Sequence, residues 1–353
     1  MKKIFLLLLF IIFTILFISC SKVNTNELNK EENIQSNTKL DEFYSNIKSG
    51  GVPMDGIPPI EIPVYIDKVE VDNYLDDEDR VFFYRDEDIV KVFPQSILVW
   101  HEIVNDRFGE KNVSITYCPL TGSVIGYFSG DTTLGVSGKL LNSNLVMYDR
   151  KTESYYPQIL GTSIYGDKKG QGLDTFMINW STWGKVKENF DEIMVLSEDT
   201  GFFRDYDRDP YGSYDMEDSY YYNNTVFFEP MIDDGRLPKK QVVIGVIDGE
   251  SRLAVKFSDV REEGIINYSV GDKWIALVYD EKLDTVRVFE RNSEDQIMSL
   301  SEDKSYIKDN RASTWNLEGV STNGKDDLKW VRSFDVMWFS WAAFFPEADV
   351  YGE

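Results

Sequence analysis

Residues 111–123 read KNVSITYCPLTGS, and this stretch decides the fold class. The β-branched and aromatic residues from Val113 to Tyr117 are typical of a strand. Pro119 cannot donate to a sheet ladder, so we expect the strand to end at Cys118. Short runs of similar β-favouring composition recur along the chain, separated by Gly, Asp, Asn and Pro. These other runs are 226–228, 241–247, 273–279 and 285–290.

Helical spacing of apolar residues is confined to a few segments. Ile97, Trp100, Ile103 and Val104 give the first segment its helical pattern. Because strand-like runs are far more common, we expect a β-dominated α+β protein with a few inserted helices. The segments expected to be helical are Ser96–Arg107, Trp183–Phe190 and Val336–Phe345.

A shift of 162 residues brings the β-rich runs of the chain into register. Val81 then falls on Val243 and Tyr117 on Tyr279, and the apolar pattern agrees between such identities. We therefore predict a single large domain with two pseudo-repeated β-rich halves and a polar insert between them. The expected parts are copy one at about 80–130, the insert at about 131–240, copy two at about 242–292 and a C-terminal segment at 293–353.

The mismatches between the two copies concern the residues with the most distinctive chemistry. His101 corresponds to Glu263, and Cys118 corresponds to Asp280. If the repeat holds, both copies share the scaffold, whereas the imidazole and the thiol belong to the first copy only.

The N-terminus is typical of an exported lipoprotein. Two lysines precede an apolar run from Ile4 to Ile18, and Ser19-Cys20 follows, as in a secretory signal with a lipidated cysteine. We expect residues 1–19 to be the signal peptide, 20–40 the lipidated Cys20 and a disordered tether, and 41–353 the globular domain. The predicted location is the cell envelope, lipid-anchored to a membrane on the extracytoplasmic side. An uncleaved N-terminal anchor is the alternative.

The net charge of −24 disfavours nucleic acid and anionic lipid as partners, because both are bound by positive potential. The expected contact with the membrane is therefore the N-terminal lipid. An acidic, solvated surface is the simplest interpretation of the charge.

Cys118 is left without an intrachain partner once Cys20 carries lipid. A lone thiol outside the cytoplasm is either buried as a small hydrophobe or used. Thr121 and Ser123 offer hydroxyls beside the sulfur, and the Cys-x-x-Thr spacing resembles a Cys-x-x-Cys redox motif. The position at a strand end favours a functional thiol.

His101 is the only histidine of the chain. Near the C-terminus of its expected helix, the macrodipole would favour the imidazolium and help to keep a nearby thiol ionised. A zinc-protease helix needs a second histidine where this chain has Asn105, so that function is rejected. The sequence separation leaves open whether His101 and Cys118 meet in space.

Several segments together resemble an uncharacterised exported family, the domain-of-unknown-function family 3179, also described as a (seleno)protein family. The resemblance implies a domain whose reaction is not established. It also implies selenocysteine, in some members, at the position of Cys118, and a second cysteine, in some relatives, at that of Thr121. The segments that carry it are WHEIVND (100–106), YCPLTGS (117–123), VSGKLLNSNLVMYDR (136–150), residues 157–158, residues 209–211 and WFSWAAF (338–344).

The leading hypothesis is thiol-based redox chemistry in the cell envelope, with Cys118 as nucleophile and His101 as its charge partner or base. An external thiol reductant or a small molecule would be the partner, and no cofactor is required. A non-catalytic ligand- or copper-binding module using Cys118, His101 and Met147 is one alternative. A Cys–His acyl-transfer enzyme, with Asn105 or Asp106 orienting the imidazole, is another. The supporting or substrate-binding candidates are Thr121, Ser123, Asn105, Asp106, Asn142, Asn144, Asp149 and Arg150.

Overall fold

The computed structural model describes residues 37–353 apart from 72, 73, 87 and 215. The chain divides into two compact units, Met1–Glu42 and Phe43–Glu353, and the second unit is described below. The expected signal peptide and Cys20 lie outside the described residues. Within the described part of the chain, no helix is both long and apolar enough to cross a membrane.

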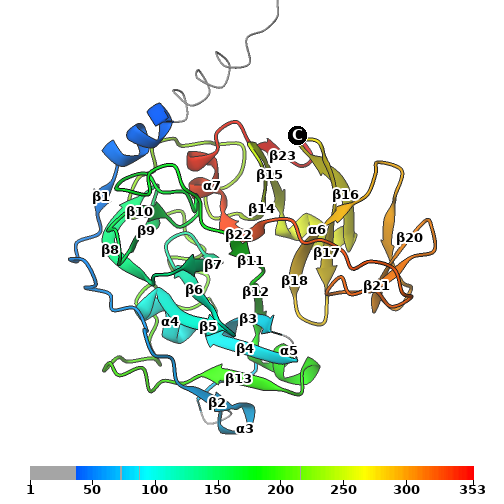
Figure 1. Cartoon of the computed structure of the whole chain (residues 1–353), viewed down its shortest axis with the longest axis horizontal. Coiled ribbons are helices and arrows are strands. Elements are labelled where there is room, and N and C mark those ends of the chain that lie inside the picture. The colour runs from blue at the N-terminus through cyan, green and yellow to red at the C-terminus, as the bar shows by residue number, and fades with distance from the viewer. Residues whose placement is uncertain (1–36, 72–73, 87, 215) are drawn as a thin grey trace, which may run out of the picture. The chain divides into compact units, whose positions relative to one another are not determined.

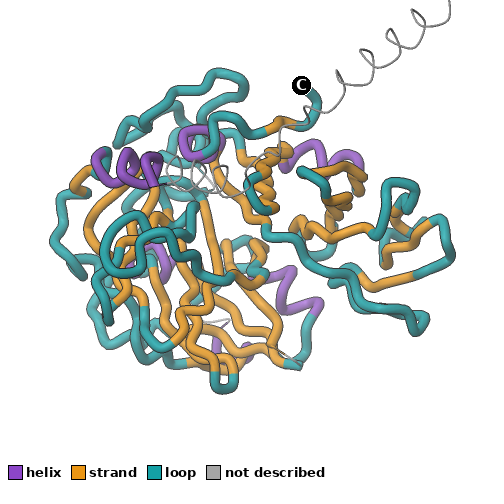
Figure 2. The backbone as a smooth tube through the Cα atoms, turned by 45° about the horizontal axis from the view of Figure 1, so that its top comes forward, coloured by secondary structure: helices purple, strands orange, loops and turns teal. Residues whose placement is uncertain are grey.

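Strands predominate over helices in this unit (Figure 2), which confirms the prediction of a β-dominated α+β protein. The first half contains two sheets. One has the order β12-β3-β4-β13-β2, with β2 (Tyr65–Asp67), β3 (Arg80–Asp86), β4 (Ile89–Pro94), β12 (Asn179–Thr182) and β13 (Ile193–Leu196). The other has the order β11-β7-β6-β5, with β5 (Ile103–Phe108), β6 (Lys111–Cys118), β7 (Ser123–Gly130) and β11 (Thr175–Phe176). The helices are α3 (Lys68–Val71), α4 (Gln95–His101) and α5 (Trp183–Asn189).

The second half also contains two main sheets. One has the order β22-β14-β15-β23, with β14 (Val242–Asp248), β15 (Ser251–Lys256), β22 (Ser333–Met337) and β23 (Asp349–Val350). The other has the order β16-β17-β18, with β16 (Ile265–Val270), β17 (Lys273–Asp280) and β18 (Thr285–Arg291). The helices are α6 (Phe257–Glu263) and α7 (Trp338–Phe344).

Strand pairing has the same register in both halves. Val81 pairs with Pro94 as Val243 pairs with Lys256, and Cys118 pairs with Ser123 as Asp280 pairs with Thr285. Each of the four residues of the first half lies 162 positions before its counterpart in the second half, which is the shift seen in the sequence. Later elements also correspond, because α5 begins at Trp183 and α7 at Trp338, and both tryptophans are fully buried. That the halves descend from one duplicated segment stays a prediction.

Each half carries an additional small sheet. The sheet of the first half has the order β1-β8-β9-β10, and the other has the order β19-β20-β21. Strands β16, β17, β18, β20 and β21 lie together on the right of Figure 1. The bounds are β1 (Lys48–Ser49), β8 (Leu134–Leu141), β9 (Asn144–Asp149), β10 (Tyr155–Pro157), β19 (Met298–Leu300), β20 (Tyr306–Asp309) and β21 (Thr314–Asn316).

Several sequence-based assignments differ from the structure. The run 226–228, expected to be a strand, forms none. The segment expected to be helical over 336–345 begins as strand, because Val336 and Met337 pair with β14, and α7 starts only at Trp338. The segment expected to be helical over 96–107 is helix only to His101, and β5 begins at Ile103. Glu102 causes the change, because its left-handed backbone (φ 57°, ψ −30°) cannot continue a helix. The segment interpreted as a polar insert, about 131–240, contains β8 to β13 and α5. Its longest described stretch without helix or strand begins at residue 197 and continues through 241, up to β14.

The core explains why β6 positions the candidate site. This strand pairs with β5 on one side and with β7 on the other, and its residues from Val113 to Cys118 are all buried. A continuous buried run of this kind is typical of a strand covered on both faces. Cys118 is therefore held at the end of a central strand, inside the protein.

Candidate functional site

Cys118 ends β6 beneath a hairpin of the additional sheet. Its side chain is 1 % exposed. The Leu145 N–H donates to Sγ at 3.4 Å, and Sγ–H donates to the Ser143 carbonyl at 3.7 Å. The thiol is thus fixed by β9 and by the turn that precedes it.

The hairpin turn is built from Asn142 and Ser143, which join β8 to β9. Both have positive φ angles, 52° and 62°, as a two-residue hairpin turn with right-handed strand twist requires. Asn142 Oδ1 accepts from the Met231 N–H at 2.9 Å, whereas its buried Nδ2 has no hydrogen-bond partner in the described structure. The turn therefore contains an unpaired donor group, the Asn142 amide, next to Ser143.

The turn after Cys118 is closed by the backbone. The Thr121 N–H donates to the Cys118 carbonyl at 3.2 Å, and Gly122 has a φ of 57°, which glycine adopts without strain. Pro119 ends the strand as expected. The CPLTG sequence therefore forms a tight turn that returns the chain to β7.

A buried polar network holds this turn against β9. Thr121 Oγ1 and Ser123 Oγ are 2.8 Å apart, and the Asn144 amide donates to Thr121 Oγ1 at 3.1 Å. Gln158 accepts from Ser123 Oγ at 2.7 Å and from Asn144 Nδ2 at 2.8 Å. Its own amide donates to the Thr116 and Ser123 carbonyls, both at 3.1 Å. Thr121, Ser123 and Asn144 thus belong to one network at the turn after Cys118, and their supporting roles at the thiol stay predictions.

Glu102 is the acidic neighbour of the thiol. Its carbonyl accepts from the Tyr117 N–H at 2.7 Å, which ties the end of α4 to the residue before Cys118. Burial raises the pKa of Glu102 to about 8. Burial first, and then the negative field of Glu102, raise the pKa of the Cys118 thiol to about 11.

Lys240 is the basic neighbour. It is 9 % exposed, and its Nζ lies 3.1 Å from the centroid of the Tyr220 ring. Nζ has no hydrogen-bond partner in the described part of the chain. Burial lowers the pKa of Lys240 to about 7, and the field of the Cys118 thiolate opposes this shift.

Tyrosines from residues 197–241 complete the surroundings. The Tyr220 hydroxyl donates to the Leu120 carbonyl at 2.9 Å, in the turn after Cys118. Burial raises the pKa of Tyr211, and the fields of Glu102 and Cys118 raise it further. At neutral pH the thiol, the Glu102 carboxyl and a large share of the Lys240 amine are uncharged, which is the state a dry site favours.

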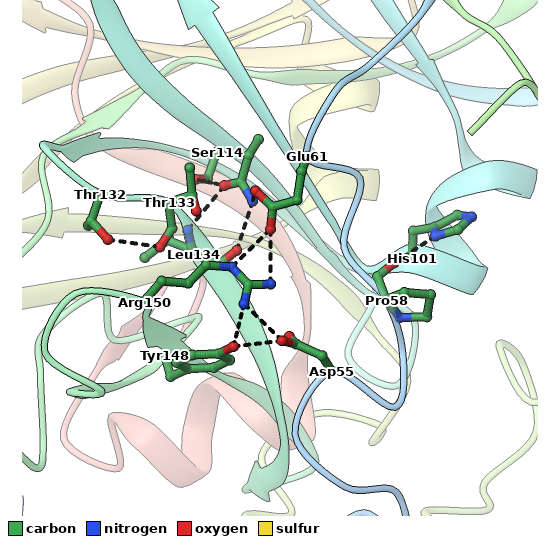
Figure 3. A network of polar contacts seen from close by, with 11 residues as sticks. Asp55, Pro58, Glu61, His101, Ser114, Thr132, Thr133, Leu134, Tyr148 and Arg150 are labelled. Atoms are coloured by element: carbon green, nitrogen blue, oxygen red, sulfur yellow. Dashed lines mark hydrogen bonds and ion pairs between the residues drawn. The ribbon is translucent and has the colours of Figure 1, made fainter. Parts of the chain in front are cut away.

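His101 makes its hydrogen bonds elsewhere. Nδ1 lies 2.7 Å from the Pro58 carbonyl and Nε2 lies 2.7 Å from the Tyr206 hydroxyl (Figure 3 shows the contact with Pro58). A carbonyl only accepts, so Nδ1 carries the proton and Nε2 accepts from Tyr206. Burial lowers the pKa of His101 to about 4, so the ring is neutral at pH 7. No hydrogen bond joins His101 to Cys118, and its role as charge partner stays a prediction.

The remaining polar candidates belong to other networks. Asn105 Oδ1 accepts from Ser114 Oγ at 2.6 Å and from the Leu134 N–H at 3.1 Å. Asp106 accepts from the Tyr65 hydroxyl and pairs with Lys91. Neither residue forms a hydrogen bond with His101 in the described structure. That Asn105 or Asp106 orients the imidazole therefore stays a prediction without a supporting contact.

Asp149 and Arg150 stabilise the additional sheet. Asp149 accepts from the Lys151 and Thr152 N–H groups, which closes its own turn. Figure 3 shows Arg150 between Asp55 and Glu61, with which it forms ion pairs at 2.8 and 2.9 Å. Both carboxylates pair with the guanidinium, and a substrate-binding role of Arg150 stays a prediction.

Met147, the third residue of the copper hypothesis, lies in the middle of β9 and is fully buried. No group of three His, Cys, Asp or Glu side chains in the described residues is arranged to hold a metal ion. Because both ring nitrogens of His101 are hydrogen-bonded, a copper site there would need them released. The copper hypothesis stays a prediction.

Three residues of the site were missed by the sequence analysis, namely Glu102, Gln158 and Lys240. A signal for Glu102 was available, because the 162-residue shift places it over Gly264. Glycine in one half suggests a positive φ, which is uncommon for glutamate and often marks a functional residue. Lys240 had no such signal, since it lies 122 residues after Cys118, at the end of a segment without periodicity.

The fold and site define a β-rich protein with a buried thiol that interacts electrostatically with an acidic side chain, Glu102, and a basic one, Lys240. The chain belongs to the family described as "Protein of unknown function (DUF3179)", whose model matches residues 54–348. Neither a curated protein nor a solved structure matches the chain.

Proposed function

We propose that the protein is a thiol-based redox protein in which Cys118 reacts with a hydroperoxide. The observation that carries the proposal is Lys240, a buried amine without a hydrogen-bond partner in the described structure. Its Nζ lies over the Tyr220 ring, whose hydroxyl donates to the Leu120 carbonyl in the turn after Cys118. Burying an amino group without a partner costs several kcal/mol, about 2–7 on transfer scales. Such a group is retained more readily where it serves a reaction.

The proposed reaction begins with proton transfer from the Cys118 thiol to the neutral amine of Lys240. The resulting thiolate attacks one oxygen of the hydroperoxide, the O–O bond breaks, and Cys118 becomes a sulfenic acid. The leaving alkoxide or hydroxide takes the proton from Lys240. Overall, a thiol and a hydroperoxide give a sulfenic acid and an alcohol or water.

The resting state is protected by the same environment. With a pKa raised to about 11, the thiol is protonated and a poor nucleophile at neutral pH. Thr121 supports the thiolate once it forms, because its hydrogen bonds to Cys118 act to lower the thiol pKa. Reduction by an external thiol would return Cys118 to its starting state. We place this chemistry on the extracytoplasmic side of a membrane, through the lipid on Cys20.

The test uses the full chain in detergent, treated with hydrogen peroxide and then unfolded in urea with dimedone, so that the trap reaches the sulfur. Mass spectrometry of the Cys118 peptide should show the dimedone adduct, and Cys118→Ser should show none. Lys240→Met should slow the reaction roughly 100-fold, the lower end of a general-base effect. Lys239→Met is the matched control, because Lys239 is partly exposed and paired with Asp233 at 2.9 Å.

An unmodified Cys118 in the folded wild type, with rapid modification after unfolding, would show an inert buried cysteine and overturn the proposal. Equal rates in Lys240→Met and Lys239→Met would remove Lys240 from the reaction. The Cys–His acyl-transfer and the copper- or ligand-binding alternatives both depend on His101, so the observations favour peroxide chemistry over them.

A further inference from the structure

We propose that Lys240 is the resolving residue for oxidised Cys118 and forms a sulfur–nitrogen bond with its sulfenic acid. In dithiol proteins a second cysteine has this role and forms a disulfide instead. The inference rests on the proposed function and adds the step that follows oxidation. Its starting point is the missing second thiol. The chain has two cysteines, and Cys118 is free and buried. Thr121 holds the position of the second thiol in a Cys-x-x-Cys motif, and its hydroxyl already contacts Ser123 and Asn144.

Tyr220 holds the amine of Lys240 at the site. The Nζ atom lies 3.1 Å above the ring centroid and 5.4 Å from that of Phe339. The Tyr220 hydroxyl is hydrogen-bonded to the Leu120 carbonyl, two residues after Cys118. The contact of Nζ with the ring and the hydrogen bond of Tyr220 to Leu120 together join Lys240 to the turn that follows Cys118.

The backbone fixes Lys240 to the same turn. The Met337 N–H, at the end of β22, donates to the Thr121 carbonyl at 2.9 Å. The next two N–H groups along the chain, of Trp338 and Phe339, donate to the carbonyls of Gln241 and Lys239 at 2.8 and 3.0 Å. One short segment is therefore bonded both to the turn after Cys118 and to the residues on either side of Lys240.

The amine is also in the right chemical state. Only a neutral amine has a lone pair for attack, and a lysine in ordinary solvent is protonated at neutral pH. Lys240 has no carboxylate or carbonyl within hydrogen-bond distance of its Nζ in the described structure. The ring faces and the Cys118 thiolate favour the ammonium form, and oxidation of Cys118 to the sulfenic acid removes the thiolate. Burial without a partner therefore leaves a usable share of the amine neutral.

The step balances without a further oxidant. The lone pair of Lys240 Nζ attacks the sulfur of Cys118–SOH, the S–O bond breaks, and the hydroxide leaves as water with one amine proton. The product is Cys118–S–NH–Lys240, so the protein has lost two hydrogens relative to its reduced form. An external thiol then attacks the sulfur, releases the amine with a proton and leaves a mixed disulfide. A second thiol reduces this disulfide and restores Cys118.

The experiment measures the mass of the full chain in detergent after stoichiometric hydrogen peroxide, followed by proteolysis without reductant. The expected result is a cross-linked peptide pair, one containing Cys118 and the other Lys240, lighter than their sum by two hydrogens. Dithiothreitol should separate the pair. In chains whose Cys20 is not lipidated, a disulfide between Cys118 and Cys20 would cause the same mass loss, but its peptide partner would contain Cys20.

Three variants sharpen the result. Cys118→Ser and Lys240→Arg should abolish the cross-link, since a guanidinium stays protonated and does not attack. Lys239→Arg should retain it. Because the wild-type peptide map already identifies the linked residues, the inference is testable even where a variant fails to fold.

The outcomes separate this inference from the proposed function. Sulfenic acid trapped on Cys118 without any link to Lys240 would overturn the inference and support the proposed function. A link from Cys118 to Cys20 would do the same. A Cys118 that peroxide leaves unmodified in the folded chain would overturn both.

Discussion

The ends of β6 and β17 occupy corresponding places in the two halves but are stabilised in opposite ways. In the second half, Asp280 closes its own turn by accepting from the Lys282 and Leu283 N–H groups at 3.1 and 3.3 Å. Its other oxygen pairs with Arg287 at 2.8 Å, and both side chains are at most 5 % exposed. In the first half, Cys118 instead takes its contacts from the distant β8–β9 hairpin.

Under the proposed function, the same scaffold position serves structure in the second half and chemistry in the first. The Asp280–Arg287 pair is nearly self-contained, so removing either partner leaves a buried charge. Around Cys118, by contrast, burial brings the pKa values of Glu102 and Lys240 to about 8 and about 7, where protons move easily at neutral pH. The first half thus contains groups that are costly to bury, and the proposed function would use them.

The largest expected effect comes from breaking the pair in the second half. Asp280→Ala leaves the Arg287 guanidinium buried without a counter-ion, and we expect it to lower the free energy of unfolding by about 3–5 kcal/mol. Cys118→Ala removes one sulfur atom from a packed site and should cost about 1–2 kcal/mol. Urea unfolding followed by tryptophan fluorescence measures both. Equal losses in the two variants would contradict the assignment of a structural role to one end and a chemical role to the other.

The next effect concerns pH and Glu102. Its pKa is about 8 in the folded chain, above its ordinary value of 4.5, so the folded state binds the extra proton. The resulting stability is fully present below about pH 4.5 and is lost as pH rises through 8. Glu102→Gln cannot ionise, so it should match the wild type near pH 4.5. Above pH 8 it should be more stable than the wild type by an amount of the order of a few kcal/mol.

The control for this prediction is Glu262→Gln in α6. Glu262 is exposed and stands two residues before Gly264, the counterpart of Glu102. The free energies of unfolding of Glu262→Gln and of the wild type should differ by the same amount across this pH range. The reason is that an exposed carboxylate stays hydrated in both the folded and the unfolded chain. A difference between Glu102→Gln and wild type that is independent of pH would contradict a buried, titrating Glu102.

The sequence predicted the parts of the site that depend on local chemistry. Val113 to Tyr117 form a strand and Pro119 ends it, because β-propensity and the missing proline N–H act within a few residues. Thr121 and Ser123 follow Cys118 in a tight turn, and the hairpin of β8 and β9 brings the Asn144 amide to Thr121. Lys240 was not predictable, since its placement depends on how residues 197–241, without helix or strand where they are described, fold over the turn.

The pairing of His101 with Cys118 was a hypothesis of the same long-range kind. It relied on the rarity of the two side chains rather than on a pattern that would bring them together. Glu102 decides the local geometry, because its left-handed backbone ends α4. The carbonyl that accepts from the Tyr117 N–H, next to Cys118, is therefore that of Glu102. His101, one residue earlier, is hydrogen-bonded to Pro58 and Tyr206.

The smallest expected effect compares the left-handed positions at the two helix ends. Gly264 has a φ of 75°, and a Cβ added there would lie 3.2 Å from Leu300 Cδ1, so Gly264→Ala should cost about 1–2 kcal/mol. Glu102→Gly, measured at pH 4.5, should change stability by less than about 1 kcal/mol. The relief of left-handed strain at Glu102 is offset by the entropy that glycine loses on folding.

The same Glu102→Gly variant also removes the carboxylate that raises the pKa of Cys118, so alkylation of the thiol above pH 8 should become faster. A large loss of stability in Glu102→Gly with unchanged alkylation would mean that glutamate is retained for packing. Faster alkylation at nearly constant stability would mean that the first half keeps glutamate, in a conformation suited to glycine, for its charge beside the thiol.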